Sequence, residues 1–529
     1  MRLLQRFSFL FLLTVVFNSC RKPVATNWDI DAVFPVVNSK LNIKNFLGDS
    51  ILVSDNTGLL SVNFSREITA IKLDSLLNLP DTSITNTFTV PAVFPTTVTP
   101  GQTFTIFPAS ELDFNISNDV ALKRLDIRSG GLTVKFSNTI AEPIDLLYII
   151  PSAKKNGQPL TIFETVPTGT NSLIKTYDLS GYSLNMRGMS GNAYNTIIQS
   201  YTLALNPNAN VTTITYGMGA KANLTYSNIV PDYVEGYFGH QLIDIPLDTT
   251  NFDVFNNLQA SNFLLNSATL NFKIKNEFGA EFTGNFSAVK SVNSINSNVV
   301  QLTNGLLSNL NINRAVKSGN SILPSVKSVS LSNTNSNIVN FLSNLPNKLT
   351  YQGSINVNPL GNISGYNDFA FYNTGIKVFA DINIPLRFNA DYFKLSSVTA
   401  VDFSDIKQLD NVNSGNFIIS AINGYPFRAQ LQAYLVNQDK QIIDSLFLPG
   451  SNFLERGIVD AQNIVINPMA SKLSVPITKS RIENLKKTKS IKLVTYFLLP
   501  SNPPDIKIYD NYLFDVNIVA ELNYNIKQN

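Results

Sequence analysis

The residue types that most often carry out chemistry in proteins are scarce in this chain. Its 529 residues include one histidine, His240, and one cysteine, Cys20. A Ser-His-Asp hydrolase needs a nucleophilic serine, but the segment around Ser190 reads GMSGN and lacks the G-x-S-x-G pattern. A zinc site needs three or four His, Cys or acidic ligands. We therefore predict no enzyme activity, no metal and no cofactor, and we expect His240 to be a turn or strand-end residue.

Other ligand-binding motifs are incomplete. A calcium loop needs acidic residues at fixed spacing, whereas Asp29, Asp31 and Asp55 stand in short, isolated segments. The sequence contains no glycine-rich phosphate loop and no dinucleotide fingerprint. The two carboxylates of a glycosidase can come from distant positions, so the sequence leaves that activity open.

The first twenty residues have the pattern of an export signal. Arg2 and Arg6 give a positive start, and residues 7–17 form an almost unbroken apolar stretch. This stretch suits a secretory signal peptide and is shorter than the roughly 20 apolar residues of a membrane-spanning helix. No later apolar stretch reaches such a length, so we expect the rest of the chain to lie outside the bilayer.

The end of this signal, Ser19 followed by Cys20, resembles the lipobox of bacterial lipoproteins, in the looser form of the Bacteroidota type. The resemblance implies that residues 1–19 are removed as a signal peptide and that the Cys20 thiol is acylated. Phe17 and Asn18 depart from the strict lipobox. An ordinary signal peptide with an unrelated cysteine and an uncleaved anchor are the alternatives. A lone cysteine forms no intrachain disulfide.

Acylation of Cys20 would attach the protein to the outer membrane. Each buried methylene contributes about 0.8 kcal/mol, so the two or three chains of a lipoprotein cysteine give stable attachment. Surface-exported lipoproteins of the Bacteroidota type often carry acidic residues soon after the cysteine. Here Arg21 and Lys22 follow, and Asp29 is the first acid. We therefore favour the periplasmic face over the cell surface.

Composition narrows the class of partner. The chain has 40 basic and 37 acidic residues and a net charge of +3, which argues against nucleic acid as a partner. Hydrophobic residues make up 44% of the chain and charged residues 15%, so it can build packed cores. Its length suggests three or four domains.

Apolar and polar residues alternate along much of the chain. Examples are GLLSVNFSREI from Gly58 and SATLNFKIKNEF from Ser267. Alternation with a period of two indicates half-buried strands, and the scattered glycines and prolines suit turns. We predict a mostly β chain of tandem β-sandwich, immunoglobulin-like domains with a few short helices.

Three segments share one pattern, in which an alternating strand ends at an asparagine, a short turn follows and a second strand begins. The asparagines are Asn138, Asn276 and Asn423, spaced by 138 and 147 residues, which is the size of a domain. The pattern resembles the hairpin of immunoglobulin-like and water-stress (WHy-type) β-domains; chance similarity in an Asn-rich chain is the alternative. We predict an N-terminal β segment at 20–110 and β-domains at 111–235, 236–393 and 394–529.

Two longer helices are expected. The first has Ser336 as N-cap and ends before Pro346; the second begins after Thr478. Shorter helical turns are expected in NIKNFLG and LDSLLNLP. The basic residues around the second helix suit either a solvated helix face or contact with anionic headgroups.

Three serines fit the Asp-Ser-aliphatic acceptor of Bacteroidota-type O-glycosylation: Ser50, Ser75 and Ser445. Motifs of three residues also arise by chance, so glycosylation here is a hypothesis.

Together these features predict a non-enzymatic, lipid-anchored envelope protein. We expect it to act as a structural or adaptor protein that binds an envelope protein or a polysaccharide. Two alternatives stay open: a glycan-binding lipoprotein of a nutrient-uptake system, and a carrier of apolar ligands. A glycan binder should expose coplanar aromatic rings, and a carrier should contain a continuous apolar cavity.

Overall fold

The computed structural model confirms the mostly β class. It describes residues 27–47, 51–77, 79–89, 95–256, 258–303, 305–319, 321–401, 403, 409–448, 450, 452–499 and 506–527. In these residues the strands pair antiparallel within several sheets, and the helices are short. The predicted signal peptide and Cys20 lie outside the described residues.

Three parts of the chain share one strand order, and we call them repeats 1, 2 and 3. Each repeat has two sheets, which in repeat 1 the short strand β11 (Ser183–Asn185) joins into one ten-stranded sheet. The first sheet of repeat 1 has the order β4 (Thr82–Thr89), β14 (Gly219–Tyr237), β7 (Ala121–Asn138) and β10 (Gly169–Asp178). The second sheet of repeat 1 has the order β6 (Thr103–Asp113), β12 (Thr196–Leu205), β8 (Ile144–Lys155) and β9 (Gln158–Val166).

Repeat 2 follows the same order. Its first sheet contains β3 (Leu60–Lys72), β27 (Gly375–Pro385), β18 (Thr269–Asn276) and β24 (Ser325–Leu331). Its second sheet contains β15 (Gln241–Asn251), β25 (Lys348–Val357) and β19 (Phe282–Asn293), with β20 (Asn298–Gln301) and β21 (Leu310–Ile312) at the outer position, where they pair with opposite ends of β19. Two short strands therefore replace the single outer strand of repeat 1.

Repeat 3 again has this order. Its first sheet contains β1 (Asn27–Leu41), β39 (Phe514–Lys527), β30 (Val412–Asn423) and β36 (Met469–Pro476). Its second sheet contains β29 (Tyr392–Ala400), β37 (Ser490–Leu498) and β31 (Arg428–Val436), with β32 (Ile442–Ser445) and β33 (Phe453–Leu454) at the outer position.

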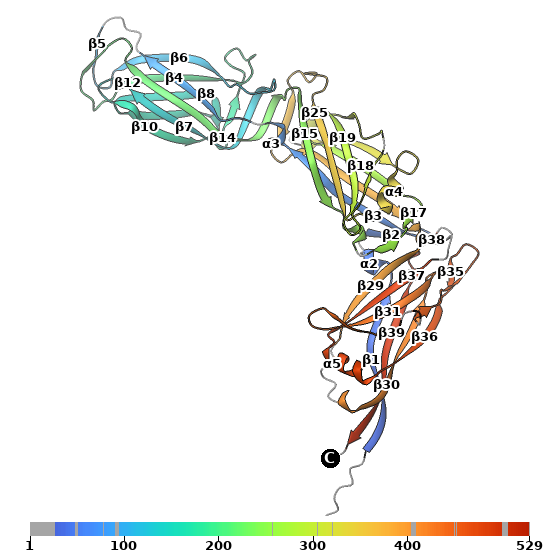
Figure 1. The fold of residues 1–529 in the computed structure, drawn as a ribbon. Coiled ribbons are helices and arrows are strands. Elements are labelled where there is room, and N and C mark those ends of the chain that lie inside the picture. Colours follow the sequence, from blue (N-terminus) through green and yellow to red (C-terminus); the bar gives the residue numbers. More distant parts are fainter. Residues whose placement is uncertain are drawn as a thin grey trace, which may run out of the picture. The chain divides into compact units, whose positions relative to one another are not determined.

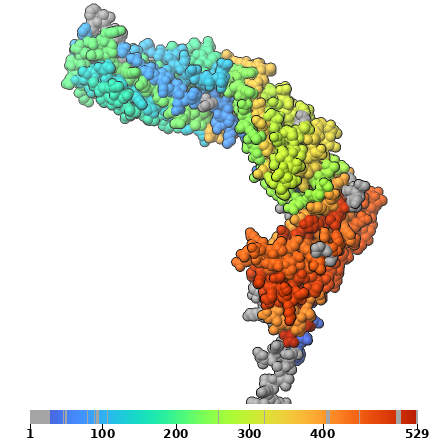
Figure 2. Space-filling view, in the orientation of Figure 1, coloured from blue at the N-terminus to red at the C-terminus, as the bar shows by residue number. Residues whose placement is uncertain are grey.

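The repeats are nested in the sequence. The N-terminal strands β1, β3 and β4 join repeats 3, 2 and 1 in that order, and the chain then completes repeats 1, 2 and 3 in turn. In Figure 1 the N-terminal strand β1, in blue, lies along the C-terminal strand β39, in red, with which it pairs in repeat 3. In Figure 2, blue residues of the N-terminal segment lie among the cyan and green residues of repeat 1. We therefore describe β1, β3 and β4 with the repeats that they join.

Residues 235 and 393, at which two domain boundaries are predicted, lie near the end of β14 and the start of β29, and the division into domains at these positions stays a prediction. The described residues form two compact units. One comprises the described residues up to 63, within 253–267 and from 384 onward, and holds repeat 3; the other comprises those within 64–252 and 268–383 and holds almost all of repeats 1 and 2.

The two sheets of each repeat enclose an apolar core because alternate residues of each strand point inward. The burial of β18 and β8 alternates strictly along most of their length. In repeat 2 the rings of Phe272 and Phe286 stack across the sheets at 5.9 Å, and in repeat 3 Phe497 meets Phe514 at 5.5 Å. Each such buried side chain contributes about 1.5–3 kcal/mol.

Shorter strands complete the described structure. They are β2 (Leu52–Ser54), β5 (Thr96–Val98), β11 (Ser183–Asn185), β13 (Thr212–Ile214), β16 (Gln259–Ser261), β17 (Leu264–Leu265), β22 (Val316–Ser318), β23 (Ser321–Leu323), β26 (Asp368–Phe371), β28 (Arg387–Asn389), β34 (Ile458–Val459), β35 (Val465–Asn467) and β38 (Ile506–Lys507). Single 3-10 turns occur at Asp253–Phe255 and Leu409–Asn411.

The helices lie where the sequence predicts them. In α5 (Lys479–Lys487) the N-cap Thr478 accepts from the Arg481 N–H at 3.3 Å, as expected. In α4 (Ile338–Ser343) the N-cap is Asn337, so the choice of Ser336 is wrong by one residue. The Ser336 hydroxyl still accepts from the Ile338 N–H at 3.3 Å and donates to the Ser332 carbonyl at 2.8 Å, while the Asn337 side chain makes no capping bond. The short α2 (Lys44–Leu47) and α3 (Leu73–Leu76) match the two predicted helical turns.

Asparagine is the main turn residue of this chain. Among the described residues, nine of the fourteen non-glycine residues with positive φ are asparagines. Asparagine tolerates this left-handed backbone because its short side chain can bond locally.

Candidate functional site

The predicted modification sites fall in different surroundings. Cys20 and Ser50 lie outside the described residues. Ser75 is exposed in α3, and its hydroxyl donates to the Asp74 carboxylate at 3.3 Å. Ser445 is half-buried at the end of β32, where its carbonyl accepts from Arg481 at 3.1 Å. Of the two described serines, Ser75 is the more accessible to a modifying enzyme.

His240 lies between β14 and β15, at a strand end as expected. Its Nδ1 is 3.0 Å from the Asn358 carbonyl oxygen, so Nδ1 carries a proton and donates to that oxygen. Its ring is thus oriented by a backbone group, whereas a catalytic triad needs a carboxylate in that position.

A buried carboxylate shares the partner Asn358 with His240. Asp368 of β26 is fully buried, and its Oδ2 accepts from the Phe238 N–H at 3.1 Å and from the Asn358 side-chain amide at 2.8 Å. Its Oδ1 faces Arg314 at 3.7 Å. These bonds hold β26 against the turn that links β14 to β15, so we interpret Asp368 as a residue that joins repeats 1 and 2 within their unit.

The three repeated asparagines have the same contacts, and we call each arrangement an asparagine clamp. Each side chain is at least 99% buried at the end of its strand. The side-chain oxygen accepts from the N–H two residues ahead: Ile140 at 2.8 Å, Phe278 at 2.9 Å and Tyr425 at 3.0 Å. The side-chain amide donates to the carbonyl four residues ahead: Glu142, Ala280 and Phe427, at 2.9, 2.9 and 3.0 Å.

Each clamp also reaches a distant loop. The same amides donate to the carbonyls of Val166, Asn313 and Glu455, at 3.1, 2.8 and 3.0 Å. The residue two positions ahead is fully buried in every case: Ile140, Phe278 or Tyr425. The clamp therefore fixes the turn that carries the chain from the first sheet to the second, which explains why the three segments share a pattern.

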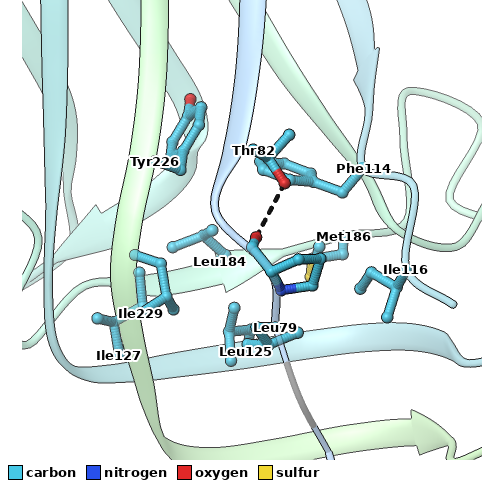
Figure 3. Close-up of a pocket in the computed structure, with 11 residues that line it drawn as sticks. Leu79, Thr82, Phe114, Ile116, Leu125, Ile127, Leu184, Met186, Tyr226 and Ile229 are labelled. Atoms are coloured by element: carbon cyan, nitrogen blue, oxygen red, sulfur yellow. Dashed lines mark hydrogen bonds between the residues drawn. The ribbon is translucent and has the colours of Figure 1, made fainter.

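Repeat 1 contains a small apolar cavity of about 40 Å³, shown in Figure 3. Its lining comes from strands far apart in the sequence and includes Leu79, Phe114, Leu125, Leu184, Met186 and Ile229. At one wall the Thr82 hydroxyl donates to the Pro80 carbonyl at 3.1 Å. Ligand pockets usually measure about 300–1,000 Å³, so this cavity is too small for a lipid chain.

A larger pocket of about 460 Å³ adjoins it and shares Leu79 and Ile229. Its lining mixes apolar side chains with charges of both signs: Glu67, Lys72, Asp74 and Lys377. Neither of these two pockets is the continuous apolar cavity that a carrier should have.

Aromatic rings that could bind a sugar face were also sought. Tyr194 and Tyr366 stack on each other at 4.1 Å and 19°, and both are half-buried. The exposed Trp28 and Tyr216 lie in separate strands or loops of the described chain. Because Tyr194 and Tyr366 stack on each other, the two rings do not lie side by side as a coplanar platform.

Among the described residues, no group of three or more His, Cys, Asp or Glu side chains is placed to hold a metal ion. None of the described helices has the length and apolar character of a membrane-spanning helix.

Comparisons with known proteins give little guidance. No protein-family model and no curated protein matches the chain. A crystal structure of a protein from Parabacteroides distasonis, described as secreted, is 12% identical over 53% of this chain and 82% of that chain, with a TM-score of 0.25. The VP2 subviral particle of infectious bursal disease virus is 8% identical over 92% of this chain and 86% of that chain, with a TM-score of 0.12. Scores this low support no functional argument.

The sequence pattern found the clamp asparagines but not the pocket residues. The asparagines follow an alternating strand, which is a local signal. The pocket residues become neighbours only through strand pairing over long sequence distances, which no local spacing reports.

Proposed function

We propose that the chain is a non-enzymatic, lipid-anchored protein of the outer membrane that acts as a structural adaptor of the cell envelope. The observation that carries this proposal is the nested strand order, in which the N-terminal segment supplies a strand to the first sheet of all three repeats. A protein anchored through its N-terminus and holding a partner must transmit force from the anchor to its folded parts.

The pairing of β1 suits this task. It forms an antiparallel ladder with β39 from Asn27 opposite Lys527 to Leu41 opposite Phe514. A pull on the N-terminus would load these backbone hydrogen bonds together along the strand. Val37 and Leu41 add buried apolar contacts, with 3% and 2% exposure.

The anchor itself would lie close to this ladder. Six residues lie between Cys20 and Asn27, so the two are seven residue steps apart, and an extended chain spans at most about 3.3–3.6 Å per step, or roughly 25 Å in all. We therefore propose that the end of the ladder at Asn27 and Lys527 faces the membrane, on the periplasmic side.

Cys20→Ser tests the anchor. We expect this variant to carry no acyl chains, to keep its signal peptide and to be missing from the outer-membrane fraction, while Arg21→Ala, which leaves the thiol in place, stays acylated and in the outer membrane. Cys20→Ser protein that is still cleaved and still sediments with membranes would contradict lipid anchoring. Protease treatment of intact cells then reports the face, since a periplasmic protein is protected until the outer membrane is opened.

The adaptor role has its own test. The tagged lipoprotein is purified from its native membrane in mild detergent, and its partners are identified by mass spectrometry. We expect an envelope protein at a fixed ratio to the lipoprotein, and its loss on deletion of β4 to β14 would place the contact in repeat 1. Recovery of the lipoprotein alone would contradict the adaptor role.

A further inference from the structure

One surface of repeat 1 gathers positive charge from both of its sheets. The short strand β11 pairs with β7 and with β8, so it bridges the first sheet and the second. Ser183 of β11 lies opposite both Asp126 and Lys154, and Asn185 lies opposite Arg124. In the described parts of repeats 2 and 3 the two sheets are not joined in this way.

This bridge lines a pocket of about 480 Å³, within the usual range for small-ligand sites. Four cationic side chains border it: Lys123, Arg124, Lys154 and Arg187. Pro151 and Ile198 add apolar contacts, and Ser152, Ser183 and Asn185 add polar groups. Glu235 is the acidic residue of the lining.

Two of the four cations are already paired. Lys123 lies 3.3 Å from the Glu235 carboxylate and donates to the Asn367 side chain at 2.7 Å. Arg124 donates to both oxygens of Asp126, at 2.9 and 2.8 Å. These acids hold the two side chains in place at one wall of the pocket.

The other two cations are available. Lys154 and Arg187 are exposed, and neither side chain makes an ion pair or a hydrogen bond within the described chain. The backbone of Arg187 is fixed, because its N–H donates to the Asn185 side chain at 3.2 Å and the residue bridges to Thr196. Two uncompensated cations in one pocket contrast with the near-neutral balance of the whole chain.

We propose that this pocket binds a small anion, with Arg187 and Lys154 holding carboxylate or phosphate groups and Lys123 and Arg124 completing the positive surroundings. The planar guanidinium of Arg187 can donate two parallel hydrogen bonds to a carboxylate or phosphate, and Lys154 adds a point charge. The ligand is either a free anion or an acidic sugar residue of a glycan. This inference does not depend on the adaptor role.

The test uses the full lipoprotein in non-ionic detergent, with binding measured by calorimetry at low and at physiological salt. The probes are inorganic phosphate, oligogalacturonate and a neutral oligosaccharide of the same length. We expect the first or the second to bind, more weakly at the higher salt because exposed charges are screened, and the neutral sugar not to bind. Binding of phosphate alone indicates a free anion, and tighter binding of oligogalacturonate indicates an acidic glycan.

A matched pair of double variants locates the site. Lys154→Gln with Arg187→Gln should weaken binding at least tenfold, since each charge-assisted hydrogen bond contributes substantially. Lys135→Gln with Lys221→Gln removes the same charge from exposed positions of repeat 1 outside the pocket and should change affinity less than twofold. Equal melting temperatures show that both variants fold. Equal loss of affinity in both variants, or no binding of either anion by the parent protein, would overturn the proposal.

Discussion

Repeats 1 and 3 build the same strand order around the same asparagine clamp, yet their interiors differ. Repeat 3 has a continuous cluster of buried rings: Phe393, Tyr425, Phe427, Phe497 and Phe514. Repeat 1 instead has a small apolar cavity and a strand, β11, that joins its sheets next to a basic pocket.

The comparison shows that the strand order and the asparagine clamp are common to both repeats. The side chains packed between the sheets differ, and they decide whether a repeat has a tightly packed core or a cavity. Tightly packed rings make repeat 3 suited to hold the ladder between β1 and β39. The bridged sheets of repeat 1 bring side chains from both sheets to one surface, which is what a binding site needs.

We expect the largest change in stability when a core side chain is truncated, and we expect it to be larger in repeat 3 than in repeat 1. Phe497→Ala removes a fully buried ring in contact with Phe393, Tyr425, Phe427 and Phe514, and should lower the free energy of unfolding of its unit by about 3–5 kcal/mol. Leu184→Ala, beside the cavity of repeat 1, should cost about 2–3 kcal/mol. Denaturant unfolding followed by hydrogen exchange in each unit measures both. A smaller loss for Phe497→Ala than for Leu184→Ala would contradict the comparison.

Replacing a clamp asparagine by alanine should lower stability by an intermediate amount, similar in repeats 1 and 3. Asn423→Ala and Asn138→Ala each leave one N–H and two carbonyls without their side-chain partner. We expect each to lower the free energy of unfolding of its unit by about 2–4 kcal/mol. Asn416→Ala, at an exposed position of β30, serves as the control and should change it by less than about 0.5 kcal/mol. If only one of the two variants lowered the free energy of unfolding, the prediction that the clamps stabilise both repeats equally would be contradicted.

The smallest expected change in stability concerns repeat 2. There the residue after the clamp asparagine is Glu277, whereas in repeats 1 and 3 it is Thr139 and Gly424. Burial alone would raise the pKa of Glu277, but a hydrogen bond from Lys275 at 2.8 Å and the charge of Lys377 at 3.4 Å hold it below its ordinary value. A lowered folded-state pKa means that this stabilisation is present above the unfolded-state pKa and is lost as pH falls through the folded-state value.

Glu277→Gln should therefore lower the free energy of unfolding by up to about 1 kcal/mol at pH 7, with the difference from the parent protein vanishing in strong acid. Unfolding curves recorded from pH 7 to pH 2 measure it. A difference that grows as the pH falls would contradict the assigned sign.

Local signals in the sequence were sufficient for a large part of the fold. Alternating residues such as Leu270, Phe272 and Ile274 specify a half-buried strand by their period alone, and Thr478 marks the start of α5 because a side-chain oxygen at that position satisfies a free N–H. The spacing of Asn138, Asn276 and Asn423 pointed to one repeated turn, since the clamp depends on residues two and four positions ahead. The N-cap of α4 was misplaced because Ser336 and Asn337 are both good capping residues.

The sequence by itself thus indicated many of the strands and marked the asparagines and turns of the three clamps, because these features depend on neighbours within a few residues. The tertiary structure alone decided that β1, β3 and β4 belong to three different repeats, and that β11 brings Arg124 and Lys154 to one pocket. The physical reason is that backbone hydrogen bonds between strands are the same for every residue type. Which free strand edge a segment joins is therefore decided by the packing of the whole chain and not by its own residues.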